Sequence, residues 1–239
     1  MITFFRKIRQ KLLSQNRVTR YLVYAIGEII LVVIGILIAL QVNNWNEATK
    51  LKRQEIQLLK EMLTELRKQQ QDFIFNINHH REAKEACEIL LQALSNDQPY
   101  HDSLDIHFSR SYNFTILDNQ QNAFAALKSK GITMIQNDSL RFLISEYYDV
   151  RMPFQIKIQE GSMKQGLEIS QSHLGLFQNF AWNKSMEPWD FEELKKNRAY
   201  LSWLSFTADN RGFEMENFQT TLKRNSALIA SITEELNQK

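Results

Sequence analysis

One stretch constrains the fold of this chain more than any other: the apolar run LVYAIGEIILVVIGILIALQV, from Leu22 to Val42. As an α-helix these 21 residues would rise about 31 Å, which matches a bilayer hydrocarbon core of about 30 Å. No polar side chain occurs between Ile29 and Leu40, whereas core helices of soluble proteins usually keep a polar face. The run exceeds a signal-peptide core, and no small-x-small cleavage site follows it. We therefore predict an uncleaved membrane-spanning helix over 21–43, rather than a buried core helix or a removed signal peptide.

The segment before this run is basic and contains no acid. Its charged side chains are Arg6, Lys7, Arg9, Lys11, Arg17 and Arg20. After the run, Lys50 and Lys52 are mixed with Glu47 and Glu55. Because Lys and Arg are enriched on the cytoplasmic side of membrane spans, we expect residues 1–20 to lie in the cytoplasm, as a basic amphipathic segment on the inner leaflet. Residues 44–239 would then form an extracytoplasmic domain.

Two features inside the predicted span concern packing. Gly35 and Ala39 form a small-xxx-small pair, and Gly27 lies on the same side two turns earlier, so another helix could approach this face closely. We expect a homo-oligomer or a partner membrane protein there, in addition to the lipid bilayer. Glu28 is an acid within the span, and such residues are often functional. It is either an interfacial acid or a group that senses protons or a partner, such as an acid that pairs with a basic residue of another membrane helix.

The rest of the chain has the composition of long helices. It contains only 7 Gly and 3 Pro in 239 residues, or about 3% and 1% against averages of about 7% and 5%. Apolar residues step by three and four over 56–94 and again over 201–236, and no Gly or Pro occurs between Ile36 and Gln98. We predict an all-α fold in which the span continues into the first outer helix as one rod. A second long helix would pack antiparallel on it in a bundle, with Leu201 near Leu94 and Leu236 near Leu59.

The region between the two rods is less regular. We expect a connection over 96–118 and a helix over 119–130 ended by Gly131. A helix capped by Asp138 or Ser139 should follow, with a kink or break at Pro153. Helix should resume towards Phe180, followed by a turn over 181–190 and a short helix from Phe191.

Candidate metal ligands do not have metal-site spacing. His79 and His80 point about 100° apart on a helix, so they cannot chelate together, although His80 and Cys87 share one helix face. His101, Asp105 and His107 would share a face if their segment were extended, but a polar loop is the simpler interpretation. We expect neither a metal nor a cofactor. Cys87 is the only cysteine, and we expect a buried thiol rather than a cross-link between chains.

The sequence also lacks the motifs of the common enzyme classes, including GxGxxG, the P-loop, HExxH and GxSxG, so we do not expect an enzyme. A net charge of +2 gives no reason to expect a nucleic-acid partner. One aromatic group stands out and indicates either a packed distal core or a ligand pocket. Its members are Trp182, Trp189, Phe191, Tyr200, Trp203 and Phe206.

The N-terminal fifth of the chain resembles a known family. MITFFRKIRQKLL, followed by YAIGEIILVVIGILIALQVNNWNE, is similar to the opening of a family of uncharacterised single-pass membrane proteins of gram-negative bacteria. The segment AFAALKSKGITMIQNDSLRFLISEYY resembles a second stretch of these proteins. The resemblance implies anchoring in the bacterial inner membrane with a periplasmic domain, and it implies no activity.

Three hypotheses for function follow. The first is a membrane-anchored helical scaffold that acts through protein–protein contacts. The second is an extracytoplasmic sensory module that signals through a partner, since only about twenty residues would remain inside. The third is an enzyme without a familiar motif, which requires a polar pocket with two or more buried titratable groups.

Overall fold

The computed structural model describes residues 6–7, 10, 18–96 and 98–239, and it divides into two units, Met1–Gln54 and Glu55–Lys239. Most of the described residues are helical, and these residues contain no β-strand apart from two isolated bridges, Phe177–Pro188 and Ala181–Ser185. The all-α prediction is therefore confirmed. The predicted amphipathic segment 1–20 falls largely outside the described residues.

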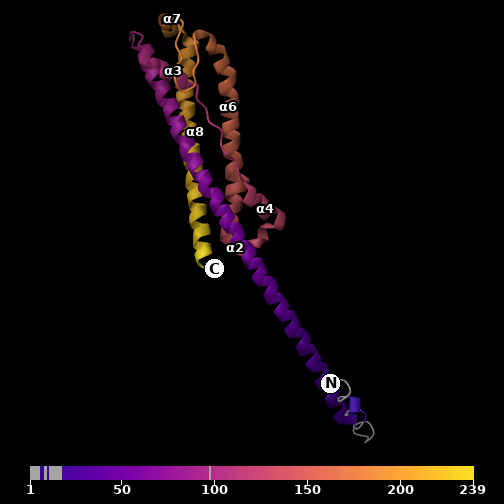
Figure 1. Cartoon of the computed structure of the whole chain (residues 1–239). Coiled ribbons are helices and arrows are strands. Elements are labelled where there is room, and N and C mark those ends of the chain that lie inside the picture. The colour runs from indigo at the N-terminus through magenta and orange to yellow at the C-terminus, as the bar shows by residue number, and fades with distance from the viewer. Residues whose placement is uncertain (1–5, 8–9, 11–17, 97) are drawn as a thin grey trace. The chain divides into compact units, whose positions relative to one another are not determined.

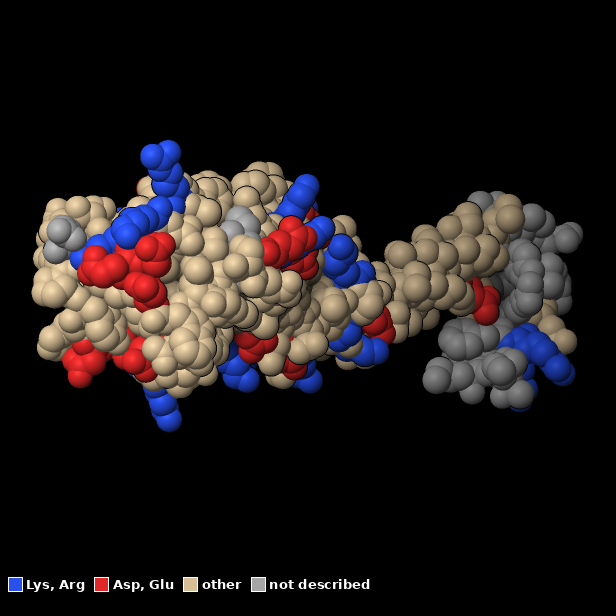
Figure 2. Space-filling model, turned by 90° about the horizontal axis from the view of Figure 1, so that it is seen from above, with Lys and Arg blue, Asp and Glu red and all other residues tan. Residues whose placement is uncertain are grey.

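The first long helix, α2, runs without interruption from Val18 to Ser95. It contains the predicted span and the predicted first outer helix, and it ends where the apolar spacing ended. The apolar run over 22–42, in the first unit, is largely exposed: Leu31 is 72% and Ile38 60% accessible. This helix is long and apolar enough to cross a membrane, and none of its most apolar window is buried. Figure 2 shows this stretch almost free of Lys, Arg, Asp and Glu, whereas both charges are scattered over the visible face of the second unit.

The second unit consists of the outer part of α2 and the helices that follow it (Figure 1). In chain order these are η1 (Asp102–Leu104), α3 (Asp105–Ser111), α4 (Asn122–Lys130), η2 (Ile132–Met134), α5 (Asp138–Ser145), the π-helical turn η3 (Glu146–Arg151), α6 (Met152–His173), η4 (Leu174–Leu176), α7 (Phe191–Lys196) and α8 (Arg198–Asn237). Gly131 ends α4 with a φ of +97°, as a C-cap glycine can.

Three local predictions were wrong in detail. The cap of α5 is Asn137, whose side chain accepts from the backbone N–H of Leu140. Pro153 does not break the helix, because the π-helical turn just before it lets the chain pass from α5 into α6. α6 ends at His173 and is followed only by the short η4, so helix stops before Phe180. The condition for a shared face of His101 and His107, an extended segment, is not met, because His101 precedes η1 and His107 lies in α3.

Contacts between α8 and the outer part of α2 occur in opposite chain order. Lys239 pairs with Glu55, the Asn225 side chain donates to the Leu66 carbonyl at 3.1 Å, and Glu214 pairs with His80 at 2.8 Å. The residue pairs that we predicted to be neighbours also share clusters. Leu236 packs against the cluster that contains Leu59, and Leu201 packs against the cluster that contains Leu94.

Two apolar clusters form the core of the second unit. The first is built round Leu59, Leu66, Phe73, Tyr147 and Phe218. The second is built round Cys87, Leu90, Phe108, Tyr200 and Trp203. Cys87 is fully buried, as expected, and burial raises the pKa of its thiol to about 12. Along α2 and α8, a group of buried polar residues lies between the two clusters, and it borders the candidate site.

Candidate ligand-binding cavity

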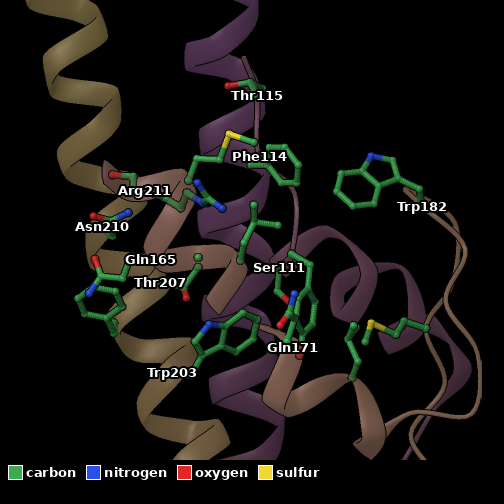
Figure 3. Close-up of a pocket in the computed structure, with 18 of the residues that line it drawn as sticks. Ser111, Phe114, Thr115, Gln165, Gln171, Trp182, Trp203, Thr207, Asn210 and Arg211 are labelled. Atoms are coloured by element: carbon green, nitrogen blue, oxygen red, sulfur yellow. The ribbon is translucent and has the colours of Figure 1, made fainter. Parts of the chain in front are cut away.

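A cavity of about 510 Å³ opens in the second unit beside this polar group. Its walls come from α6, α8, the coil after α3 and the loop that carries Trp182, and His80 reaches it from α2. In Figure 3, Arg211, Thr207 and Trp203 approach from α8, and Trp182 lies on the separate loop. The volume lies in the usual range for small-molecule sites, about 300–1,000 Å³.

Three buried ionisable side chains form one end of the cavity. His80 Nδ1 lies 2.8 Å from Glu214 Oε2, and Arg211 Nη1 lies 3.0 Å from the same oxygen. A second nitrogen of Arg211 donates to the Asn113 carbonyl at 2.5 Å. Burial alone would raise the pKa of Glu214, but the hydrogen bond from His80 and the charge of Arg211 outweigh it and hold that pKa well below its usual range. Glu214 is therefore a carboxylate in the folded protein at neutral pH.

Neighbouring groups hold His80 and the coil after α3 in place. The His80 ring stacks on Phe218 with centroids 5.5 Å apart, and its Nε2 lies 3.3 Å from the Thr115 hydroxyl. Gln159 of α6 donates to the Thr115 carbonyl at 2.7 Å and accepts from the backbone N–H of Leu117 at 3.1 Å. The coil after α3 is thus held against both α2 and α6.

The other end of the cavity is aromatic. Tyr112 and Trp203 lie 4.4 Å apart between ring centroids, and Phe177 meets Tyr112 edge-on at 6.3 Å. Nearer to solvent, Trp182 contacts Phe114 at 5.6 Å and is 45% exposed. Trp203 and Arg211 are eight residues apart on α8, so the aromatic and charged ends are separated by about 12 Å along the helix.

Some hydrogen-bonding capacity at the site is not used by the protein. Arg211 Nε and the Tyr112 hydroxyl are buried and have no hydrogen-bond partner among the described residues. Buried polar groups are normally paired, and unpaired ones often mark positions where water, an ion or a ligand belongs. The cavity therefore has an apolar wall beside these polar groups, a combination found in small-molecule sites.

The aromatic group seen in the sequence is divided by the structure. Trp182, Trp203 and Phe206 line the cavity, Phe191 and Tyr200 belong to the second apolar cluster, and Trp189 borders a separate hollow beside α7. Both readings of the group, distal core and pocket, therefore hold for different members.

The two adjacent histidines have separate environments. His80 enters the site, whereas the His79 ring packs on Phe75 at 4.8 Å. Cys87, which shares a helix face with His80, lies in the second apolar cluster. No group of three or more His, Cys, Asp or Glu side chains that could hold a metal occurs in the described part of the chain.

Sequence reasoning missed the roles of Arg211 and Glu214. His80 and Arg211 each occupy a position of the apolar repeats over 56–94 and 201–236. A polar residue at such a position was the available signal that it has a buried polar partner.

The residues singled out in the predicted span lie in the first unit and are open. Gly27, Gly35 and Ala39 are exposed, and a Cβ atom added at either glycine would meet nothing within 4 Å. Glu28 is exposed as well. A partner helix could reach this face without displacing any described side chain.

Comparison with known proteins places the chain in a family without assigning a role. No curated protein matches it, and no solved structure matches it. Residues 28–188 match the family of unknown function DUF6090. The match covers most of α2 and all of α3 to α6, whereas α8, with Arg211 and Glu214, lies beyond it. On this match the chain belongs to DUF6090.

Proposed function

We propose that this protein is a single-pass sensory module of the bacterial inner membrane, whose helical domain binds a small molecule in the cavity between α6 and α8. Residues 21–43 would span the membrane, with the N-terminus in the cytoplasm and residues 44–239 in the periplasm. The exposed apolar surface of α2 and the basic segment before it support this placement. The outer part of α2 and α8 would pair as antiparallel rods, which the reversed order of their contacts supports.

The observation that carries the proposal is the cavity itself. A buried ion pair gives little net stability compared with apolar packing, because desolvation offsets the attraction between the charges. The chain nevertheless places His80, Arg211 and Glu214 side by side at the cavity wall. A ligand-binding role gives this arrangement a function that core packing alone would not require.

The condition for an unfamiliar enzyme, a pocket with two or more buried titratable groups, is met by the same residues. We nevertheless propose binding without catalysis. A general acid or base needs a pKa near the working pH, whereas the pKa of Glu214 is held far below it. His80 is hydrogen-bonded by Glu214 and Thr115 through its two nitrogens, which leaves neither free for a substrate.

Scaffolding through the span is a second candidate. The open face formed by Gly27, Gly35 and Ala39 favours it, because small residues permit close helix packing in membranes. A homo-oligomer or a partner membrane protein could use this face, and Glu28 could pair with a basic residue of that partner.

Ligand binding can be tested with the full chain in lipid nanodiscs. A fragment library would be screened by thermal unfolding against wild type, Asn210→Trp, which fills the cavity, and Gln219→Trp, which places the same side chain on an exposed part of α8. We expect some fragments to raise the unfolding temperature of wild type and Gln219→Trp but not of Asn210→Trp. Hits that shift all three proteins equally, or no hits at all, would contradict the proposal.

The orientation needs its own test. Alkaline phosphatase fused after Lys239 is active only outside the cytoplasm, so we expect an active fusion in a gram-negative host. An inactive but stable fusion would place the C-terminal domain inside the cell.

A further inference from the structure

We propose that the cavity binds an amphiphilic organic acid, with its carboxylate at Arg211 and its apolar body towards Trp203. The inference rests on the proposed binding function and specifies the chemistry of the ligand. It follows from the charges at one end of the cavity, the rings at the other and the distance between them.

The polar end is built to accept an anion rather than a cation. Among the described residues that line the cavity, His80, Arg211 and Glu214 are the ones whose side chains can carry a charge near neutral pH. Glu214 already accepts hydrogen bonds from both His80 and Arg211, so an entering ammonium group would have to compete with two bound donors for this carboxylate. No other carboxylate from the described part of the chain lines the cavity.

Arg211 has donors to spare. A guanidinium carries five N–H donors, and the bonds to Glu214 and the Asn113 carbonyl use one each. Its Nε is buried without a hydrogen-bond partner among the residues that the structure describes. Thr207 and Asn210 also line the cavity and can donate to an oxygen atom. Charge-assisted hydrogen bonds to a planar carboxylate are the contacts that a guanidinium forms best.

The opposite end fits an apolar body of limited length. Tyr112, Phe177 and Trp203 form its walls. Met163 and Met186 also line the cavity and add flexible, polarisable surface. Because the eight residues from Trp203 to Arg211 span about 12 Å, a phenyl ring joined to a carboxylate by a short alkyl chain would reach both ends. Trp182, which lies on a separate loop, also lines the cavity and is partly exposed.

The experiment compares three probes that share one body. Calorimetric titrations would use 4-phenylbutyrate, 4-phenylbutanol and 4-phenylbutylamine with the full chain in phosphatidylcholine nanodiscs, and titrations of empty nanodiscs would be subtracted. We expect the acid to bind at least about tenfold more tightly than the alcohol, because one charge-assisted hydrogen bond suffices for that ratio. The amine should bind more weakly than the alcohol.

Two variants test whether Arg211 is responsible. Arg211→Met with Glu214→Gln removes both charges together, so no buried charge is left unpaired, and it should reduce the preference for the acid over the alcohol to less than about threefold. Arg211→Lys keeps the charge but not the planar fork, so it should retain part of the preference. Gln219→Trp should bind all three probes as wild type does. Near-ultraviolet circular dichroism would establish that each variant is folded.

The outcomes separate this inference from the proposed function. An alcohol or amine that binds as tightly as the acid, or a preference that survives in the double variant, would overturn the inference while cavity binding stands. If no probe binds but the fragment screen yields neutral or cationic cavity ligands only, the inference is also overturned. If neither the probes nor any fragment binds, the proposed function fails with it.

Discussion

Truncation of Arg211 is the most direct test of the buried charged group. Arg211→Met removes one nitrogen from Glu214 at 3.0 Å and another from the Asn113 carbonyl at 2.5 Å. It leaves the Glu214 carboxylate, whose side chain is 3% exposed, without the guanidinium, although the carboxylate keeps its hydrogen bond from His80. Loss of one partner from a buried ion pair costs about 3–5 kcal/mol of unfolding free energy, and we expect a loss in this range.

The double variant Arg211→Met/Glu214→Gln should recover part of that loss. Removal of both charges leaves no buried ion, and the amide oxygen introduced by Glu214→Gln would still accept a hydrogen bond from His80. We therefore expect its cost to be smaller than the sum of the two single costs by at least about 1 kcal/mol, the coupling of residues in one network. Urea unfolding of the full chain in nanodiscs, followed by tryptophan fluorescence, would measure all three variants because Trp203 is buried beside the site.

Lowering the pH should reduce the contribution of Glu214 to the free energy of unfolding. The pKa of Glu214 lies below its ordinary value of 4.5 in the folded protein, so the folded state binds this proton less readily than the unfolded state does. The carboxylate therefore contributes its full stability above about pH 5, and that contribution is lost as the pH falls further. The difference in unfolding free energy between wild type and Glu214→Gln should narrow from about pH 5 to about pH 3.

Two results would refute this reasoning. A loss below about 1 kcal/mol for Arg211→Met would be the cost of an exposed pair rather than a buried one. A difference between wild type and Glu214→Gln that is independent of pH would mean that Glu214 titrates alike in the folded and unfolded chains.

Three further predictions concern the helices and the single cysteine. The Gln70 and Ser226 side chains are hydrogen-bonded at 2.9 Å. With Cys87 replaced by Ala, cysteines at these two positions should form a disulfide within one chain, whereas cysteines at Gln70 and Thr233 should not. Cross-linking of the second pair instead would mean a different register between α2 and α8. In wild type, the buried Cys87 thiol, whose pKa is raised to about 12, should resist iodoacetamide at pH 8 until urea unfolds the domain, and rapid labelling of folded protein would contradict its burial. Gly131→Ala should cost about 1 kcal/mol in urea unfolding because the residue has a φ of +97°, and an unchanged unfolding midpoint would show that this turn is not fixed.

The long helices were predictable because their causes are local. The uninterrupted α2 follows from the absence of Gly and Pro between Ile36 and Gln98 and from apolar residues at helical spacing. The end of α4 follows from Gly131 in the same way, since a positive φ favours glycine. These features depend on neighbours in the sequence, which the sequence displays directly.

The cavity was less predictable because it depends on distant neighbours. Arg211 donates a hydrogen bond to the carbonyl of Asn113, which is 98 residues away. Asn113 lies in a segment whose sequence indicates only an irregular connection. The continuous path through Pro153 was missed for a related reason. A π-helical turn replaces the usual hydrogen-bond pattern there, and Arg151 within that turn is fixed by the Thr221 hydroxyl at 2.7 Å, on another helix. Polar residues in an apolar repeat indicate that a partner exists, but only the fold identifies the partner.

Replacement of His80, Arg211 and Glu214 together would test whether this buried group serves folding or binding. Because it lies between two apolar clusters, replacing all three members with His80→Leu, Arg211→Met and Glu214→Leu would extend apolar packing across the gap. Replacement of a buried ionic group by apolar residues is often neutral or stabilising by about 1–4 kcal/mol, so we expect the triple variant to be at least as stable as wild type in urea.

Binding should change in the opposite direction. The triple variant should lose the preference for a carboxylate over the matching alcohol, because the donor of Arg211 is gone while the aromatic wall at Trp203 remains. A variant that is more stable but no longer selective would show that the chain sacrifices stability for recognition at this position. A variant that unfolds, with Arg211→Met/Glu214→Gln still folded, would instead make His80 a structural requirement of the bundle and assign the buried group to folding rather than to binding.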